Sequence, residues 1–199
     1  MLNVAVLVSG GGTNLQAIID AKARGELPRA NLALVVASRP DAYALERAGA
    51  AGIEGAVVCR RDYPDTATFN AALLSTLKAH QIDLVVLAGF LSILDEKFVR
   101  AYPNKIINVH PSLIPSFCGP GYYGLKVHEA ALARGVKVTG ATVHYVNEIA
   151  DGGEIIFQKA VAVEPGDTPE VLQKRVMEQA EWVLLPRALA LLCEKEEHA

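Results

Sequence analysis

The chain has 199 residues, 51% of them hydrophobic, and a formal net charge of −3. This length and hydrophobicity are enough to bury a full core, so we expect one compact domain. The slight negative charge, with no run of Lys or Arg, excludes the basic surface typical of nucleic-acid-binding proteins, and no segment reaches the roughly 18 apolar residues that a membrane-spanning helix needs.

The first predicted strand leads into a glycine-rich turn. Residues 4–8 form a continuous apolar run, as expected of a strand covered on both faces. Residues 10–14, Gly-Gly-Gly-Thr-Asn, follow the strand and are called the glycine loop below; the segment after them has helical spacing. A strand, a glycine-rich turn and a helix together point backbone N–H groups and a helix dipole at a phosphate. We therefore predict that Gly12, Thr13 and Asn14 bind a phosphate monoester.

The glycine loop does not match the better-known nucleotide motifs. A dinucleotide fingerprint needs a glycine where this chain has Leu15, and the next predicted strand, residues 32–37, is not followed by an acidic residue for a ribose. A P-loop needs a lysine, which the glycine loop lacks. The phosphate of a small molecule fits best, and a glycine-rich turn without a ligand is the alternative.

Strands and helices continue to alternate along the first half of the chain. The pattern predicts helices at 42–49 and 66–80, strands at 55–59, 83–88 and 106–110, and a short helix capped by Asp95. This alternation predicts an α/β fold, a Rossmann-like three-layer arrangement with a mostly parallel central sheet. The strand ends at residues 8, 88 and 110 should then line one edge of that sheet, where such folds bind ligands.

The strand at 106–110 carries two polar residues near its end. Asn108 and His110 are two positions apart, so their side chains point to the same face of the strand. Pro111 then discourages continuation of the strand. An amide beside an imidazole can stabilise an oxygen that gains negative charge. The alternative is a strand end with two ordinary, hydrogen-bonded polar residues.

The second half of the chain changes its pattern. After a helix at 126–134, two extended stretches at 138–146 and 155–163 flank a polar loop that carries Asp151, which predicts an antiparallel C-terminal addition to the sheet. A final helix starts near Pro169 and is expected to bend or divide at Pro186. The charged segment 194–199 is expected to fray.

The cysteines and the N-terminus indicate the compartment. Cys59, Cys118 and Cys193 are far apart and form no Cys-x-x-Cys pair, which favours a reducing environment over disulfides or a structural zinc. The N-terminus lacks the basic and long apolar regions of a signal peptide. We therefore expect a cytoplasmic protein without a metal site.

Taken together, the glycine loop, the Asn108/His110 pair and the Asp151 loop resemble the folate-dependent formyltransferases. The matching motifs are NVHPSLIP at 108–115, VTGATVH at 138–144, DGG at 151–153 and VSGGGTNLQAI at 8–18. The resemblance spans nearly the whole chain. The glycine loop points to the branch of the family that formylates glycinamide ribonucleotide.

This resemblance implies a reaction and a set of roles. The amine of glycinamide ribonucleotide attacks the formyl carbon of 10-formyltetrahydrofolate, a step of de novo purine (IMP) biosynthesis. Asn108 and His110 stabilise the resulting tetrahedral oxyanion and move protons, and Asp151 keeps His110 protonated or correctly oriented. A preorganised donor at such an oxyanion typically contributes about 10²–10³ in rate. No metal, no covalent nucleophile and no tightly bound cofactor are implied, because the folate is a co-substrate.

The resemblance also implies binding residues. Gly12, Thr13 and Asn14 hold the ribonucleotide phosphate, and Glu181 contacts the ribonucleotide, although the chain has one residue more than the family pattern near Glu181. A solvated helix face is the alternative for Glu181. The pterin ring of the folate is held by Phe90, Leu91, Ser92, Ile93 and Leu94, whose alternative is ordinary core, with His144 as a lesser candidate. His128 is expected on the surface or on a helix face, and a cis bond is implied at Ile114–Pro115.

The chain departs from the family pattern at a few positions. Ser92 replaces an arginine of some members, and no arginine near the predicted helix at 66–80 faces the folate, although Arg60 and Arg61 lie nearby. The loop at 116–124 is longer and richer in Gly and Tyr than the shortest versions. These departures bear on folate affinity more than on the reaction.

Several related activities serve as alternatives. Methionyl-tRNA formyltransferase carries a further C-terminal domain and a basic surface, and formyltetrahydrofolate deformylase carries an extra N-terminal domain, so neither is expected here. Sugar-nucleotide formyltransferases and a non-catalytic phosphate-binding module remain.

We expect a single domain, 1–199, with residues 1–103 as the phosphate-binding half and 104–199 as the catalytic and folate-binding half. The expected partners are small molecules only, with no nucleic acid and no membrane. The chain is expected to be a monomer or a homodimer.

Overall fold

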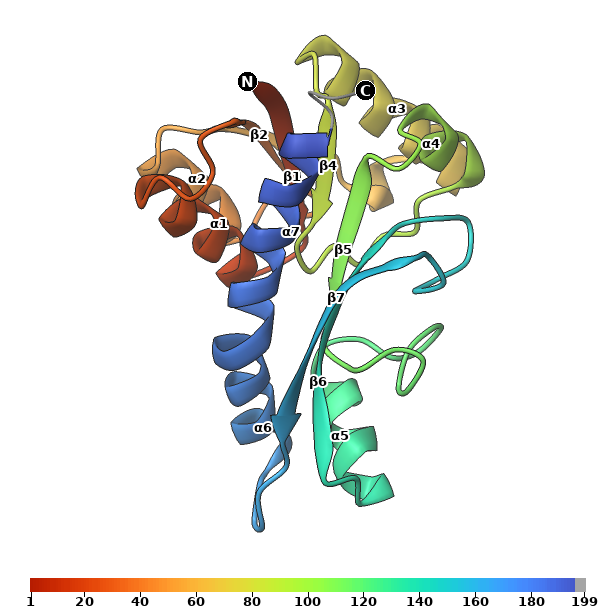
Figure 1. Cartoon of the computed structure of the whole chain (residues 1–199). Coiled ribbons are helices and arrows are strands. Elements are labelled where there is room, and N and C mark those ends of the chain that lie inside the picture. The colour runs from red at the N-terminus through yellow and green to blue at the C-terminus, as the bar shows by residue number, and fades with distance from the viewer. Residues whose placement is uncertain (196–199) are drawn as a thin grey trace.

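The computed structural model describes residues 1–195, and its centre is a seven-stranded sheet (Figure 1). The strands are β1 (Leu2–Val8), β2 (Ala30–Ala37), β3 (Glu54–Val57), β4 (Leu84–Leu87), β5 (Ile106–His110), β6 (Val138–Tyr145) and β7 (Ile155–Ala162). Their order is β3-β2-β1-β4-β5-β6-β7. The pairs from β3 to β5 are parallel, whereas β6 runs antiparallel to both β5 and β7. The predicted mostly parallel sheet with an antiparallel C-terminal addition is confirmed.

Helices cover both faces of this sheet. They are α1 (Thr13–Ala23), α2 (Ala44–Ala50), α3 (Thr66–Ala79), α4 (Glu96–Ala101), α5 (Leu125–Arg134), α6 (Pro169–Val176) and α7 (Trp182–Lys195). Local sequence sets their ends: the side chains of Asp95 and Thr168 accept hydrogen bonds from the first turns of α4 and α6. Gly135, with φ +76°, ends α5 in the left-handed conformation that glycine adopts readily.

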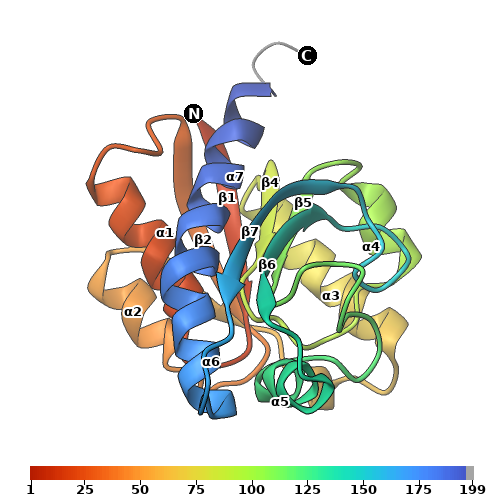
Figure 2. The ribbon, with the colours of Figure 1, turned by 60° about the horizontal axis from the view of Figure 1, so that its bottom comes forward.

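The alternating faces of the central strand build two separate cores. Val4, Val6 and Val8 of β1 pack with α1 and α7 on one face of the sheet. Ala5 and Leu7 pack with α3 and α4 on the other. Figures 1 and 2 show α1, α2 and α7 gathered on one side of the sheet and α3 and α4 on the opposite side. The result is the predicted three-layer arrangement, in which β1 and β4 are buried on both faces.

The last helical region was expected to bend or divide at Pro186, and its division lies upstream of that residue. The interruption is a π-helical turn at Met177–Glu181, whereas Pro186 lies inside α7. Because proline has no N–H, the carbonyl four residues before Pro186 has no N–H partner at that position of the helix. Residues 196–199 of the predicted frayed end lie outside the described residues.

The carboxyl ends of β1, β4 and β5 meet at one edge of the sheet, as predicted. In register, Leu7 of β1 lies beside Leu87 of β4, and Leu87 lies beside Asn108 of β5. The hydroxyl of Ser9, which follows β1, accepts a hydrogen bond from the Leu91 N–H at 2.9 Å. The segments that follow β1 and β4 are therefore tied together at this edge. Within residues 1–195, none of the helices is both long and apolar enough to cross a membrane.

Candidate active site

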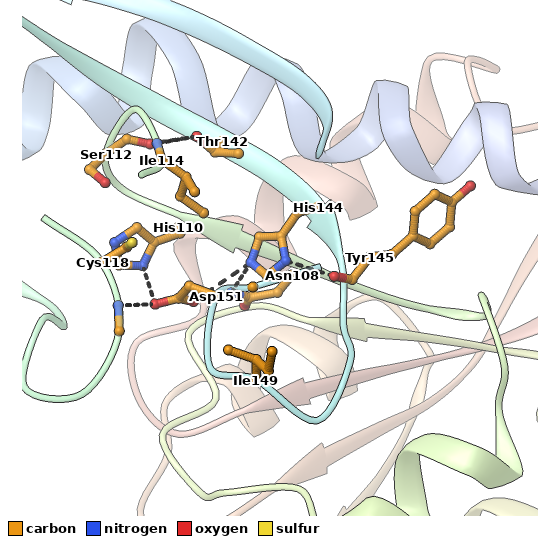
Figure 3. A network of polar contacts seen from close by, with 12 residues as sticks. Asn108, His110, Ser112, Ile114, Cys118, Thr142, His144, Tyr145, Ile149 and Asp151 are labelled. Carbon is orange, nitrogen blue, oxygen red and sulfur yellow. Dashed lines mark hydrogen bonds and ion pairs between the residues drawn. The ribbon is translucent and has the colours of Figure 1, made fainter. Parts of the chain in front are cut away.

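Three side chains predicted to act together meet beyond the end of β5. The Nδ1 atom of His110 lies 3.5 Å from Oδ2 of Asp151, and these side chains are only 5% and 15% exposed. Asn108 lies beside His110 on the same strand, and all three line one cavity. Figure 3 shows Asp151 between the rings of His110 and His144, with Asn108 close by. The loop that carries Asp151, some forty residues after His110 in the sequence, therefore places this carboxylate at the end of β5.

His144, a lesser candidate from the sequence, lies next to both Asn108 and Asp151. Its Nδ1 lies 2.8 Å from the carbonyl oxygen of Tyr145, and its Nε2 lies 3.2 Å from Nδ2 of Asn108. Because a carbonyl only accepts, Nδ1 carries the hydrogen, and Nε2 is left to accept from the Asn108 amide. Nε2 also lies 3.6 Å from Asp151. The ring therefore holds the Asn108 amide nitrogen on its Nε2 side.

The Asp151 carboxylate is stabilised in its ionised form. Burial alone would raise its pKa, but the hydrogen bond from the Gly119 N–H and the nearby rings of His144 and His110 outweigh that effect. The pKa of Asp151 therefore lies below its ordinary value. Gly119 N donates to Oδ2 at 2.8 Å, so the loop at 116–124 also holds the carboxylate in place.

The same loop contacts the second ring nitrogen of His110. Nε2 lies 2.8 Å from the carbonyl oxygen of Phe117, and Phe117 has φ +51°, which is uncommon for a bulky residue. The start of the loop is anchored by Thr142, whose hydroxyl donates to the Ser112 carbonyl at 2.7 Å and accepts from the Ile114 N–H at 3.1 Å (Figure 3). The Ile114–Pro115 bond is cis, which confirms that detail.

A cavity of about 600 Å³ opens beside the cluster. All the residues predicted to hold a pterin line it, together with two loop tyrosines: Phe90, Leu91, Ser92, Ile93, Leu94, His144, Tyr122 and Tyr123. Leu91 and Ile93 are 63% and 78% exposed, whereas Phe90 and Leu94 are half-buried against the core, so the segment forms a wall of the cavity that is anchored in the core. The volume is in the range of pockets that hold cofactor-sized molecules.

The glycine loop meets the last helical region at Glu181. Nδ2 of Asn14 donates to Oε2 of Glu181 at 2.7 Å, and Glu181 is only 6% exposed, so it does not lie on a solvated helix face. Burial raises the pKa of Glu181 to about 7, and the hydrogen bond from Asn14 only partly offsets this. Within residues 1–195, the buried Oδ1 of Asn14 accepts no hydrogen bond. Such an orphaned acceptor fits a ligand that donates to it.

Two further residues near the cluster differ in their surroundings. His128 was expected on the surface or on a helix face; it lies on α5 but is fully buried, because its face of the helix packs inward with Val127 and Ala131. Burial and the charge of His110 lower the pKa of His128 to about 4, so its ring stays neutral.

Burial, and secondarily the charge of Asp151, raises the pKa of the Cys118 thiol, which agrees with packing and not nucleophilic chemistry.

Comparisons with known proteins give a consistent result. The family described as formyl transferase matches residues 2–189. Phosphoribosylglycinamide formyltransferase of Haemophilus influenzae is 40% identical over 194 residues, which cover 98% of this chain and 88% of that protein. The glycinamide ribonucleotide transformylase 1 structure from Symbiobacterium toebii superposes with a TM-score of 0.92 at 43% identity, covering 98% of this chain and 89% of that one.

A larger relative contains the same region. The trifunctional purine biosynthetic protein adenosine-3 of Drosophila melanogaster is 42% identical over 190 residues. These residues cover 95% of this chain but only 14% of that protein. The chain therefore corresponds to a small part of the trifunctional relatives.

Proposed function

The chain belongs to the formyl transferase family, among the phosphoribosylglycinamide formyltransferases, and on that basis we propose that it transfers a formyl group from 10-formyltetrahydrofolate to the amine of glycinamide ribonucleotide, a step in the formation of IMP. The observation that carries the proposal is the convergence of Asn108, His110 and Asp151 on one cavity, at the sheet edge that also holds the glycine loop. A protein that only binds phosphate has no need of these three side chains.

The reaction needs charge stabilisation at one oxygen. When the amine adds to the formyl carbon, the formyl oxygen becomes an alkoxide in a tetrahedral intermediate. Asn108 and His110 donate hydrogen bonds to it. The second N–H of the Asn108 amide remains available because His144 takes only one. The Nε2 of His110 now faces the Phe117 carbonyl, so the formyl oxygen takes the place of that carbonyl when substrate binds.

Asp151 orients His110 and balances its charge. The carboxylate lies against Nδ1, so a hydrogen on that nitrogen points at Asp151 while Nε2 donates to the substrate. As the new C–N bond forms, the amine loses one proton, and as the old C–N bond breaks, N10 of the folate gains one. The His110–Asp151 pair, directly or through a water, carries this proton. The step needs no covalent bond to the protein.

The two substrates approach from opposite sides of this cluster. The ribonucleotide phosphate lies on the glycine loop, where Gly12, Thr13 and Asn14 and the N-terminus of α1 supply donors. Glu181 and the free Oδ1 of Asn14 accept hydrogen bonds from the ribonucleotide. The folate enters the cavity of about 600 Å³, which the segment around Ser92 lines. It is a co-substrate and not a tightly bound cofactor.

The same proposal covers partners and location. Both substrates are small molecules, and the net charge of −3 offers no attraction to nucleic acid. Cys59, Cys118 and Cys193 are all free thiols, in keeping with a cytoplasmic enzyme.

A competition between acceptors tests the proposal. The purified chain is supplied with 10-formyltetrahydrofolate and with glycinamide ribonucleotide, water alone or initiator methionyl-tRNA, and formation of tetrahydrofolate is followed. We expect rapid transfer only with the ribonucleotide. Equal turnover in water alone would indicate a deformylase, and turnover only with the tRNA would indicate the tRNA-directed activity.

A further inference from the structure

Helix α2 contacts the glycine loop through hydrogen bonds and close packing. The Ala44 N–H donates to the Gly10 carbonyl at 3.1 Å, and Nε of Arg47 donates to the Gly11 carbonyl at 2.8 Å. A Cβ atom at Gly12 would lie 2.6 Å from Cβ of Ala44, so this residue must be glycine for the loop to approach α2. Three successive residues of the loop are thus fixed against one short helix.

These contacts decide where the loop's N–H groups point. In a trans peptide unit the C=O and the following N–H point in opposite directions. Because the Gly10 and Gly11 carbonyls face α2, the N–H groups of Gly11 and Gly12 face away from it. Since α2 packs against β2 and β3, and β4 lies on the other side of β1, these N–H groups face away from the side of the loop where β2 and β3 lie. Within residues 1–195, neither N–H donates a hydrogen bond.

Nothing in the loop itself fixes these peptide units. A Cβ atom at Gly10 or Gly11 would meet no atom within 4 Å, so no side-chain packing holds these two residues. A flip of either peptide plane would turn a carbonyl oxygen, which carries partial negative charge, toward the phosphate. The restraint must therefore come from outside the loop, and α2 is the element that supplies it.

Arg47 is itself held in place for this contact. Its Nη1 donates to Oε1 of Gln16 at 3.0 Å, and its guanidinium lies 5.1 Å from the centre of the Tyr43 ring. The planar guanidinium of Arg47 therefore links α2, the glycine loop and the first turns of α1. It loses little further conformational freedom in making these contacts. Arg47 also lines a second cavity of about 270 Å³ together with Arg24 and Trp182.

We propose that Arg47 is a positioning residue for phosphate binding: its guanidinium holds the Gly11 carbonyl against α2, so that the N–H groups of Gly11 and Gly12 stay aimed at the ribonucleotide phosphate. The proposal rests on the proposed function for the identity of the substrate, but not for the orientation of the loop. Arg47 acts on the loop and does not touch the phosphate itself.

Kinetics with a matched control test the proposal. Arg47→Met keeps the length of the side chain but removes the donors, and Arg24→Met removes an arginine from the same cavity whose guanidinium pairs with Glu26 at 2.6 Å instead of the loop. We expect Arg47→Met to raise the ribonucleotide KM about tenfold, the effect of one charge-assisted hydrogen bond, with kcat and the folate KM within about twofold. Arg24→Met should leave all three values unchanged.

A second measurement separates this proposal from the proposed function. Inorganic phosphate is titrated into the ¹⁵N-labelled protein, and the amide signals of Gly11 and Gly12 are followed. We expect both signals to shift in the wild type and in Arg24→Met, and to shift only at much higher phosphate in Arg47→Met. If Arg47→Met does not fold, Arg47→Lys, which lacks the planar guanidinium that bonds to both Gly11 and Gln16, replaces it in both measurements. Unchanged ribonucleotide KM and unchanged phosphate titration in the variant would overturn the proposal, as would equal increases in both KM values.

Discussion

Replacing Glu181 by glutamine should make the protein more stable at alkaline pH and weaken its ribonucleotide binding. Glu181 is 6% exposed, and burial raises its pKa from 4.5 to about 7. The folded protein therefore disfavours the ionised carboxylate. At about 1.4 kcal/mol for each pH unit, this rise corresponds to about 3 kcal/mol of lost stability once the group is ionised. Glutamine carries no charge, and its amide oxygen still accepts from Asn14.

The pH dependence follows from the sign of this shift. Below pH 4.5 the carboxyl is protonated in both the folded and the unfolded chain, so the variant and the wild type should be equally stable. Between pH 4.5 and about 7 the unfolded chain ionises first, and the wild type loses stability relative to the variant. Above pH 7 the difference should stay constant at about 3 kcal/mol.

Urea unfolding of Glu181→Gln at a series of pH values from 4 to 9 measures this difference. Glu178→Gln is the matched control, because the Glu178 side chain lies on the same helical segment but is 47% exposed. The ribonucleotide KM of Glu181→Gln should rise at the same time, because glutamine is a weaker acceptor than a carboxylate. Equal stability of Glu181→Gln and wild type at pH 8 would refute the reasoning.

Two more substitutions address the two ends of the site. His110→Ala should lower kcat by about 10²–10³, because it removes one oxyanion donor, while the ribonucleotide dissociation constant, measured by calorimetry, stays near the wild-type value; a near-wild-type kcat would remove the histidine from the mechanism. Asn14→Ala should raise the ribonucleotide KM more than the folate KM in steady-state assays, because Asn14 lies on the glycine loop. The reverse pattern would mean that the two binding sites are assigned the wrong way round.

Much of the fold could be read from the sequence because local and global signals agree. The apolar runs at β1 and β4 are buried on both faces, as parallel strands between helices must be. Glycine and capping residues mark the helix ends, and the change of pattern after residue 135 predicted the antiparallel strands. Asn108 and His110 could be paired from their spacing alone, since side chains two apart on a strand share a face.

What the sequence could not supply depends on contacts between distant segments. His144 lies opposite Asn108 because of the register of β5 and β6, and a prediction of that register would have placed it in the cluster. The burial of His128 depends on which face of α5 turns inward. The π turn at Met177–Glu181, which contains the buried Glu181, likewise cannot be predicted from the spacing of apolar residues in a helix. The hydrogen bond from Arg47 to the Gly11 carbonyl joins residues that are 36 positions apart in the sequence.

The coupling between His110 and Asp151 is the central claim, and a double-mutant cycle on kcat tests it most directly. His110→Ala, Asp151→Asn and the double variant are assayed with saturating ribonucleotide and 10-formyltetrahydrofolate. Because Asp151 acts through the imidazole, the double variant should be no slower than His110→Ala alone. If the two losses multiply instead, the carboxylate works independently of the histidine and this account of the site is wrong.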